Sequence, residues 1–217
     1  MRTNHLNNIG IIGDIHGESL FLEAALNFFI DFELELIVSV GDIIDGKGDI
    51  DRCCELLNNH SVVTIRGNHE RWFLDKSMRC LSNATQPESI NKHAYDFIAN
   101  LPITKEFNTI KGQLLLCHGI DKHDMIKVTP DDFGYGIDSN FELQELIKSN
   151  RFRFVINGHT HRRMVRSFGN LTIINAGTIK HEENPCIAIV DFKDEIVNFY
   201  DIQADLSFVE SQRFSLR

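Results

Sequence analysis

Five short apolar segments of this chain are each followed, directly or after one glycine, by aspartate, asparagine or histidine. They end at Gly13, Gly41, Arg66, Cys117 and Asn157, and the polar residues that follow are Asp14 with His16, Asp42 with Asp45, Asn68 with His69, His118, and His159 with His161. Residues 19–30 have apolar residues at helical spacing, so the first part indicates strand, helix, strand, with a parallel strand pair. Strands of such sheets present their carboxyl ends at one edge, where ligands bind. The sequence therefore predicts an α/β fold that gathers these polar side chains at one edge.

The other apolar patterns predict helices in the first half of the chain and strands in the second. Helices are expected over residues 50–59, 70–78 and 88–100, and strands over residues 61–65, 114–117, 152–156, 164–168, 171–174, 186–192 and 195–200. Residues 120–140 have no clean period, so we expect a functional or mobile loop there. We predict two packed sheets flanked by helices, in a single domain over residues 1–217.

Charge and cysteine content restrict the class of protein. A net charge of −9 argues against stable nucleic-acid binding, which depends on many lysines and arginines. The five cysteines show no CxxC spacing, which is typical of reduced thiols in the cytoplasm. Residues 1–9 contain one arginine and no long apolar core, and we expect neither a signal peptide nor a membrane span. We predict a cytoplasmic protein without membrane contact, and the sequence assigns it no oligomeric state.

The residues after the five segments have the chemistry of metal ligands. A single aspartate after a strand is usually a turn residue or helix cap, and a single histidine is usually solvated or hydrogen-bonded. Capping does not account for such residues at five successive strand ends, so we interpret them as a metal site. Mixed nitrogen and oxygen donors suit manganese, iron, zinc or cobalt better than calcium or magnesium alone. The absence of thiolate motifs argues against a structural zinc site.

The local sequences around these residues resemble the motif set of the calcineurin-like metallophosphoesterases. The matching motifs, in the order of the family, are GDIHG at 13–17, GDIID at 41–45, RGNHE at 66–70, CHG at 117–119 and GHTH at 158–161. Five motifs in order are much more specific than one. The resemblance implies a four-layer α/β/β/α sandwich with mixed sheets and a dinuclear metal site at the strand tips.

The same resemblance implies ligands and a reaction. Asp14, His16 and His161 would hold the first metal, Asn68, His118 and His159 the second, and Asp42 would bridge both. A shared carboxylate holds two cations about 3.5–4 Å apart, a separation that suits attack on a phosphate ester by a metal-bridging hydroxide. We expect two divalent ions, with manganese favoured over iron, zinc, cobalt or nickel.

Three further residues are predicted to act in catalysis. His69 resembles the catalytic histidine of the family, which is not a ligand and would protonate the leaving alkoxide or steer the phosphate. Asp45 would orient His69, although a loop cap is the alternative role. Arg66 would contact the phosphate or a carboxylate near the site, with a structural ion pair as an equal alternative.

The motifs leave the substrate class open. RGNHE and the GDxxD spacing resemble protein serine/threonine phosphatases, and we predict a phosphomonoesterase of that kind. That branch has Arg-Gly after the second aspartate, whereas this chain has Gly46-Lys47-Gly48, and lysine lacks the bidentate fork of arginine. The GHTH ending is closer to small phosphodiesterases and bis-nucleoside tetraphosphatase-like enzymes, which are the alternatives. The substrate would be a phosphorylated small molecule, a nucleotide or a phosphoprotein. A non-catalytic scaffold of this fold is a further alternative, but it should have lost ligands, and every expected ligand is present.

Overall fold

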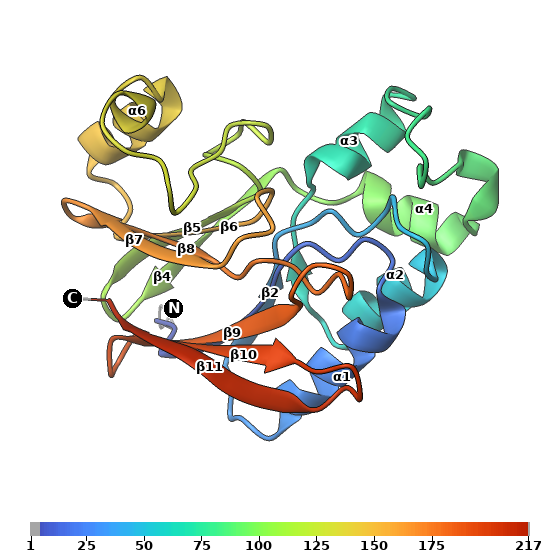
Figure 1. Cartoon of the computed structure of the whole chain (residues 1–217), viewed down its shortest axis with the longest axis horizontal. Helices are drawn as coiled ribbons and strands as arrows, with labels where there is room; N and C mark the ends of the chain where they lie inside the picture. The colour runs from blue at the N-terminus through green and yellow to red at the C-terminus, as the bar shows by residue number, and fades with distance from the viewer. Residues whose placement is uncertain (1–4, 217) are drawn as a thin grey trace.

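Two β-sheets pack face to face between layers of helices in the computed structural model, which describes residues 5–216 (Figure 1). Positions 1–4 and 217 of the predicted domain lie outside these residues. The six-stranded sheet contains β1 (Asn8–Ile12), β2 (Leu36–Ser39), β3 (Val63–Thr64), β9 (Cys186–Asp191), β10 (Ile196–Ile202) and β11 (Phe208–Ser215). The five-stranded sheet contains β4 (Thr104–Thr109), β5 (Gly112–Cys117), β6 (Phe154–Asn157), β7 (Met164–Phe168) and β8 (Leu171–Asn175).

Both sheets combine parallel and antiparallel strands. The first has the order β11-β10-β9-β1-β2-β3, with β1, β2 and β3 parallel and β9 antiparallel to β1. The second has the order β4-β5-β6-β8-β7, with β5, β6 and β8 parallel. The strands that precede the five polar motifs are therefore parallel to one another within each sheet, which places their carboxyl ends together.

The helices lie on the outer faces of the two sheets (Figure 1). They are α1 (Ser19–Ile30), α2 (Ile50–Asn59), α3 (Asn68–Leu74), the short 3₁₀ helix η1 (Pro87–Ser89), α4 (Lys92–Ala99), α5 (Tyr135–Asp138) and α6 (Phe141–Ser149). Side chains Asp49, Asn91 and Asn140 accept a hydrogen bond from the first turns of α2, α4 and α6, which fixes where these helices begin. Among residues 5–216, no helix is long and apolar enough to cross a membrane.

Strand alternation divides the apolar residues among three core layers. Ile9 and Ile11 of β1 face the other sheet, whereas Ile12 faces the helices. In β5, Leu114 and Leu116 join the layer between the sheets, and Leu115 packs in the layer that includes α6. The alternation therefore produces the helix, sheet, sheet, helix order of the four layers, and the predicted fold is confirmed.

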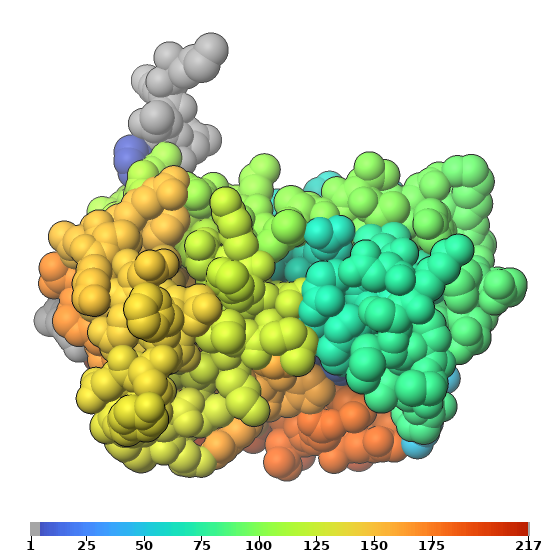
Figure 2. Space-filling model, turned by 90° about the horizontal axis from the view of Figure 1, so that it is seen from above, coloured from blue at the N-terminus to red at the C-terminus, as the bar shows by residue number. Residues whose placement is uncertain are grey.

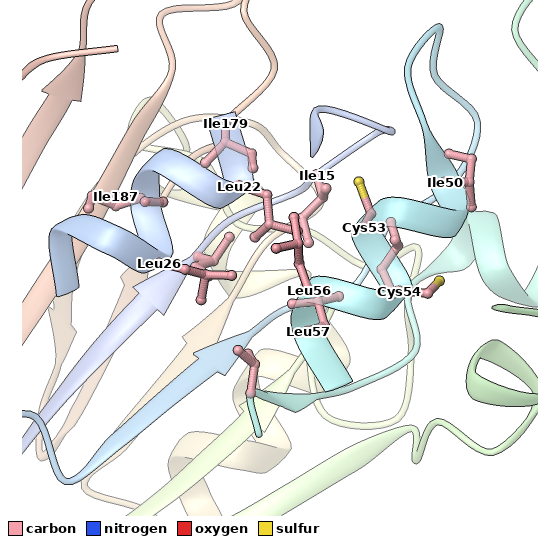
Figure 3. Close-up of a cluster of buried hydrophobic side chains, with 14 of the residues drawn as sticks. Ile15, Leu22, Leu26, Ile50, Cys53, Cys54, Leu56, Leu57, Ile179 and Ile187 are labelled. Carbon is pink, nitrogen blue, oxygen red and sulfur yellow. The ribbon is translucent and has the colours of Figure 1, made fainter. Parts of the chain in front are cut away.

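The outer layer of the six-stranded sheet is built mainly from α1 and α2. Figure 3 shows Leu22 and Leu26 of α1 beside Leu56 and Leu57 of α2, with Ile187 of β9 in the same cluster. Cys53 belongs to this layer, where burial raises the pKa of its thiol well above the usual value. These packed helices hold the crossovers between β1, β2 and β3, and so fix the loops that begin after those strands.

The sequence predicted the buried elements better than the edge elements. The helices over 19–30 and 50–59 have the predicted bounds, but α3 begins at Asn68, two residues early, and ends at Leu74. The helix predicted over 88–100 is divided into η1 and α4. Strands β4 and β11 were not predicted, because edge strands with largely exposed side chains lack a clear apolar pattern.

The layer between the sheets should dominate stability. Phe154 is fully buried there, so Phe154→Ala should lower the free energy of unfolding by about 3–5 kcal/mol through lost burial and a residual cavity. Phe141 at the start of α6 is 75% exposed, and Phe141→Ala should change the value by no more than about 0.5 kcal/mol. Urea unfolding of both variants measures the difference, and equal losses would contradict the assignment of the core.

Candidate metal centre

The nine polar residues that follow the five strands lie on one side of the molecule, at the junction of the two sheets. Asp14, Asp42 and Asn68 follow strands of the first sheet, whereas His118 and His159 follow strands of the second. Figure 2 shows the face on which the yellow-green segment after β5, the teal segment around α3 and the orange segment after β6 and β8 approach one another. The junction therefore collects side chains from both halves of the chain.

A first group is formed by Asp14, His16 and His161. The Nε2 atom of His161 lies 3.1 Å from Asp14 Oδ2 and 3.1 Å from His16 Nε2. Asp14 is fully buried, and its Oδ2 atom receives no hydrogen bond from residues 5–216. One carboxylate oxygen and two ring nitrogens thus converge on the same point, within the distances that a bound metal ion requires.

A second group is formed by Asp42, Asn68, His118 and His159. Asn68 Oδ1 lies 2.9 Å from both His118 Nε2 and His159 Nδ1, and Asp42 Oδ2 lies 3.2 Å from His118 Nε2. Asp42 also belongs to a third convergent group with His16 and His69. Asp42 therefore lies between the two groups, the position that a shared carboxylate would occupy.

Hydrogen bonds made by the outer nitrogen of each imidazole ring determine which nitrogen faces the centre. The Nδ1 atoms of His16 and His118 donate to the backbone carbonyls of Ile44 and Val40, at 3.0 and 2.7 Å. His161 Nδ1 donates to Glu183 Oε2 at 2.6 Å. Because carbonyls and carboxylates only accept, each neutral ring turns its unprotonated Nε2 toward the centre. Together with the unpartnered Asp14 oxygen, this donor set fits two divalent metal ions.

The electrostatics of the two groups follow from burial and from their carboxylates. Burial lowers the pKa of His16 and of His159, which favours the neutral ring that a ligand needs. Burial opposes protonation of His118 as well, but Asp42 raises the pKa of His118 to about 10. In the absence of a cation, a proton thus compensates the buried carboxylate, and metal binding would release it.

Several site residues have left-handed backbone conformations. The φ angles of His16, Asp42, Asp45, His159 and His161 lie between 47° and 67°. Each such conformation costs a non-glycine residue of the order of 1 kcal/mol or more and persists only where the surroundings fix it. The loops therefore store strain at the residues whose side chains converge.

His69 and Asp45 form a pair next to Asp42. His69 Nδ1 lies 2.8 Å from Asp45 Oδ2, and its Nε2 atom lies 3.9 Å from Asp42 Oδ2. Burial opposes the charged ring, but the hydrogen bond to Asp45 raises the pKa of His69. Burial also opposes ionisation of Asp45, yet its hydrogen bonds, first of all to His69, lower the pKa of this carboxyl to about 2. The structure thus brings together the predicted pair, with the free nitrogen of the ring on the side of the centre.

Neither Arg66 nor Lys47 is hydrogen-bonded or ion-paired to a residue of the centre among residues 5–216. Within residues 5–216, the Arg66 guanidinium makes no ion pair or hydrogen bond, and its backbone N–H donates to Pro102 O. Lys47 is exposed and forms an ion pair with Glu182 at 3.0 Å. The predicted contact of Arg66 with a carboxylate near the site is therefore absent from the described part of the chain.

Three residues that support the site were missed by the sequence analysis. Glu70 is fully buried and accepts backbone N–H bonds from Asp42, Ile43, Ile44 and Gly67, at 2.6 to 3.2 Å. Burial and the neighbouring Asp42 carboxylate raise the pKa of Glu70 to about 7, although the N–H groups of Gly67 and Ile43 oppose this rise. Glu183 holds His161, and Arg79 holds Asp45. The RGNHE motif contains Glu70, whereas no local pattern marks Glu183 or Arg79.

Known proteins resemble this chain in part of its sequence and in its fold. Serine/threonine-protein phosphatase 1 of Salmonella typhimurium is 38% identical over 69 residues, which cover 31% of this chain and 32% of the relative. The chain thus matches about a third of the length of that relative. The crystal structure of hypothetical protein PH1004 from Pyrococcus horikoshii superposes with a TM-score of 0.75 at 16% identity, covering 90% of this chain and 88% of that one. A structure described as a novel archaeal phosphodiesterase has a TM-score of 0.57 at 18% identity, covering 89% of this chain and 99% of that one.

The family match covers most of the chain. The model of the calcineurin-like phosphoesterase superfamily domain matches residues 8–195, from the first strand to the turn before β10. This range contains all the convergent groups described above. The chain therefore belongs to the calcineurin-like phosphoesterase superfamily.

Proposed function

We propose that the chain hydrolyses phosphate esters at two divalent ions, one held by Asp14, His16 and His161 and the other by Asn68, His118 and His159, with Asp42 shared. The observation that carries this proposal is the convergence of histidine ring nitrogens with the carboxylate oxygens of Asp14 and Asp42. The ions would supply Lewis acidity and a water-derived nucleophile. Manganese as the metal and the cytoplasm as the location remain predictions.

His69 is proposed to act as the proton donor rather than as a ligand. Its Nδ1–H is committed to Asp45, so only Nε2 is free to give a proton to a substrate oxygen. The Asp45 carboxylate favours the charged ring, which is the donor state. The backbone N–H of His69 donates to Asp42 Oδ1 at 3.0 Å, which places the ring beside the shared carboxylate. His69 therefore has both the proton and the position for protonating a leaving alkoxide.

The cations around the site bear on the substrate class. Arg71 is paired with Asp124, Arg162 with Asp131, and Lys180 with Glu183, at 2.5 to 2.6 Å. A dianionic phosphomonoester needs strong cationic contacts to its terminal oxygens, and these side chains would have to leave their partners to provide them. A phosphodiester carries one negative charge and needs fewer cationic contacts. We therefore favour a phosphodiester substrate over the phosphomonoester predicted from the motifs.

The phosphomonoesterase remains the second candidate, supported by the partial similarity to a bacterial serine/threonine-protein phosphatase. Arg66, which has no carboxylate partner within residues 5–216, keeps its predicted role as a phosphate contact in either case. A panel with added manganese separates the two candidates. It compares an aryl phosphate, a bis-aryl phosphate, a phosphopeptide and diadenosine tetraphosphate.

The first prediction of this assignment concerns the shared carboxylate. Asp42→Asn should lose metal and activity together, because the amide carries no charge to hold two cations. Metal analysis of the purified variant, beside turnover, measures both. Asp205→Asn changes an exposed aspartate in the turn before β11 and should leave both unchanged. Two bound ions and full turnover in Asp42→Asn would exclude the bridging role.

The second prediction separates chemistry from metal binding. His69→Ala should keep both ions but lower turnover of an alkyl phosphate ester by about 10²–10⁴, the usual contribution of general acid catalysis. The loss should shrink for a nitrophenyl ester, whose leaving group needs no proton. Loss of metal in this variant would instead identify His69 as a ligand.

The third prediction concerns the lysine that replaces the arginine of the phosphatase motif. Lys47→Ala should change kcat/KM by less than about fivefold for every substrate in the panel, since an exposed ion pair contributes no more than about 1 kcal/mol. The bis-aryl phosphate should be hydrolysed with a higher kcat/KM than the aryl phosphate. A preference for the phosphopeptide, together with a large loss in Lys47→Ala, would support the phosphatase alternative.

A further inference from the structure

Arg79 is a largely buried cation beside the proton donor, and its partner is Asp45. Its Nη1 and Nη2 atoms donate to Asp45 Oδ1 and Oδ2 at 2.8 and 2.9 Å, the bidentate geometry of a guanidinium and a carboxylate. The side chains of Arg79 and Asp45 are 13% and 2% exposed, so solvent screens this pair little. A fixed cation thus lies directly behind the carboxylate that holds His69.

The Asp45 carboxylate is fully engaged. Its Oδ1 atom accepts from Arg79 and from the backbone N–H of Thr85 at 2.8 Å, and its Oδ2 atom accepts from Arg79 and from His69 Nδ1. The backbone N–H of Asp45 donates in return to Thr85 Oγ1 at 2.9 Å. Rotation of the Asp45 carboxylate would break hydrogen bonds on both oxygens, so the Oδ2 atom that accepts from His69 is held in one orientation.

Arg79 itself is held by the segment between α3 and α4. Its Nε atom donates to Ser77 O at 2.8 Å, and Nη1 also donates to Thr85 O at 3.0 Å. With the two bonds to Asp45, four of its five N–H donors are occupied. The guanidinium is therefore committed to protein acceptors and is not available to clamp a phosphate, as the arginine after the second aspartate does in the phosphatase motif.

We propose that Arg79 is a positioning residue for the proton-donating step, acting through Asp45 to fix the ring of His69. This inference rests on the proposed role of His69. Removal of the guanidinium leaves a buried carboxylate with half of its side-chain partners gone, free to turn away from His69 Nδ1. The ring then loses its single orientation, and Nε2 is no longer aimed at the leaving oxygen. Within residues 5–216, Arg79 makes no hydrogen bond or ion pair with the proposed metal ligands, so they should keep their places.

The test measures kcat for two esters of the same phosphate, one with an alkyl leaving group and one with a dinitrophenyl leaving group, together with bound metal. Arg79→Met should lower kcat about 10–100-fold for the alkyl ester, the usual effect of losing an outer partner of a site residue. It should change kcat by less than about threefold for the dinitrophenyl ester, which needs no proton donor. Metal content should be unchanged. Arg52→Met is the control, because Arg52 is likewise ion-paired, but with Glu23 and Glu55 on the outer helices.

A double variant shows whether Arg79 acts through His69 or has a separate role in the reaction. In the His69→Ala background, Arg79→Met should cause no further loss for the alkyl ester, because residues that act as one unit are not additive. Additive losses, or equal losses for both leaving groups, would overturn the inference. If Arg79→Met does not fold, Arg79→Lys takes its place, because lysine keeps the charge but lacks the bidentate geometry. Its loss of kcat should depend on the leaving group in the same way but should be smaller.

The same measurements separate this inference from the proposed function. If His69→Ala lowers kcat equally for both leaving groups, the proposed role of His69 fails and the role of Arg79 fails with it. If the loss of kcat depends on the leaving group in His69→Ala but not in Arg79→Met, only the inference about Arg79 is overturned.

Discussion

The burial of negative charge where the two sheets meet is the constraint on which the site depends. Asp14, Asp42, Asp45 and Glu70 are all buried, and an isolated carboxylate in such surroundings costs several kcal/mol unless it is paired. Glu70 is compensated by four backbone N–H groups, and Asp45 by Arg79, Thr85 and His69. Asp42 has His118, whereas one oxygen of Asp14 has no hydrogen bond within residues 5–216. At the centre, the charges of Asp14 and Asp42 face His161 and His118, and bound cations would take the place of the ring protons.

The glycines of the motifs follow from the same crowding. A Cβ atom on Gly67 would lie 2.1 Å from Asp42 Oδ1, and one on Gly158 would lie 2.2 Å from Asp14 Oδ1. The backbone therefore passes directly against the carboxylates, which allows the N–H groups of His69 and His159 to donate to Asp42 and Asp14. Close backbone approach holds each carboxylate by its Oδ1 atom and leaves Oδ2 facing the centre.

Each sheet supplies half of the centre, so its geometry depends on the core between the sheets. Asp14, Asp42 and Asn68 follow strands of the first sheet, whereas His118, His159 and His161 follow strands of the second. Ile9, Ile11, Leu114 and Leu116 pack between the sheets, behind the strand ends that carry these residues. A shift of one sheet against the other would separate the ligands, and well-packed interiors resist such shifts because few voids are available.

The sequence alone predicted two packed sheets flanked by helices, the buried helices and the residues that converge, because apolar periodicity and five motifs at strand ends are local patterns. The four-layer order came from the resemblance that these motifs carry. It did not predict the edge strands β4 and β11, since exposed edges carry no such pattern. It predicted Asp45 as the partner of His69 but not Arg79, which lies 34 positions from Asp45 in a segment without regular structure. Glu183 is likewise 22 positions from His161. Partners that compensate a buried charge are selected by proximity in the folded chain, so only the tertiary structure decided how the site residues are held.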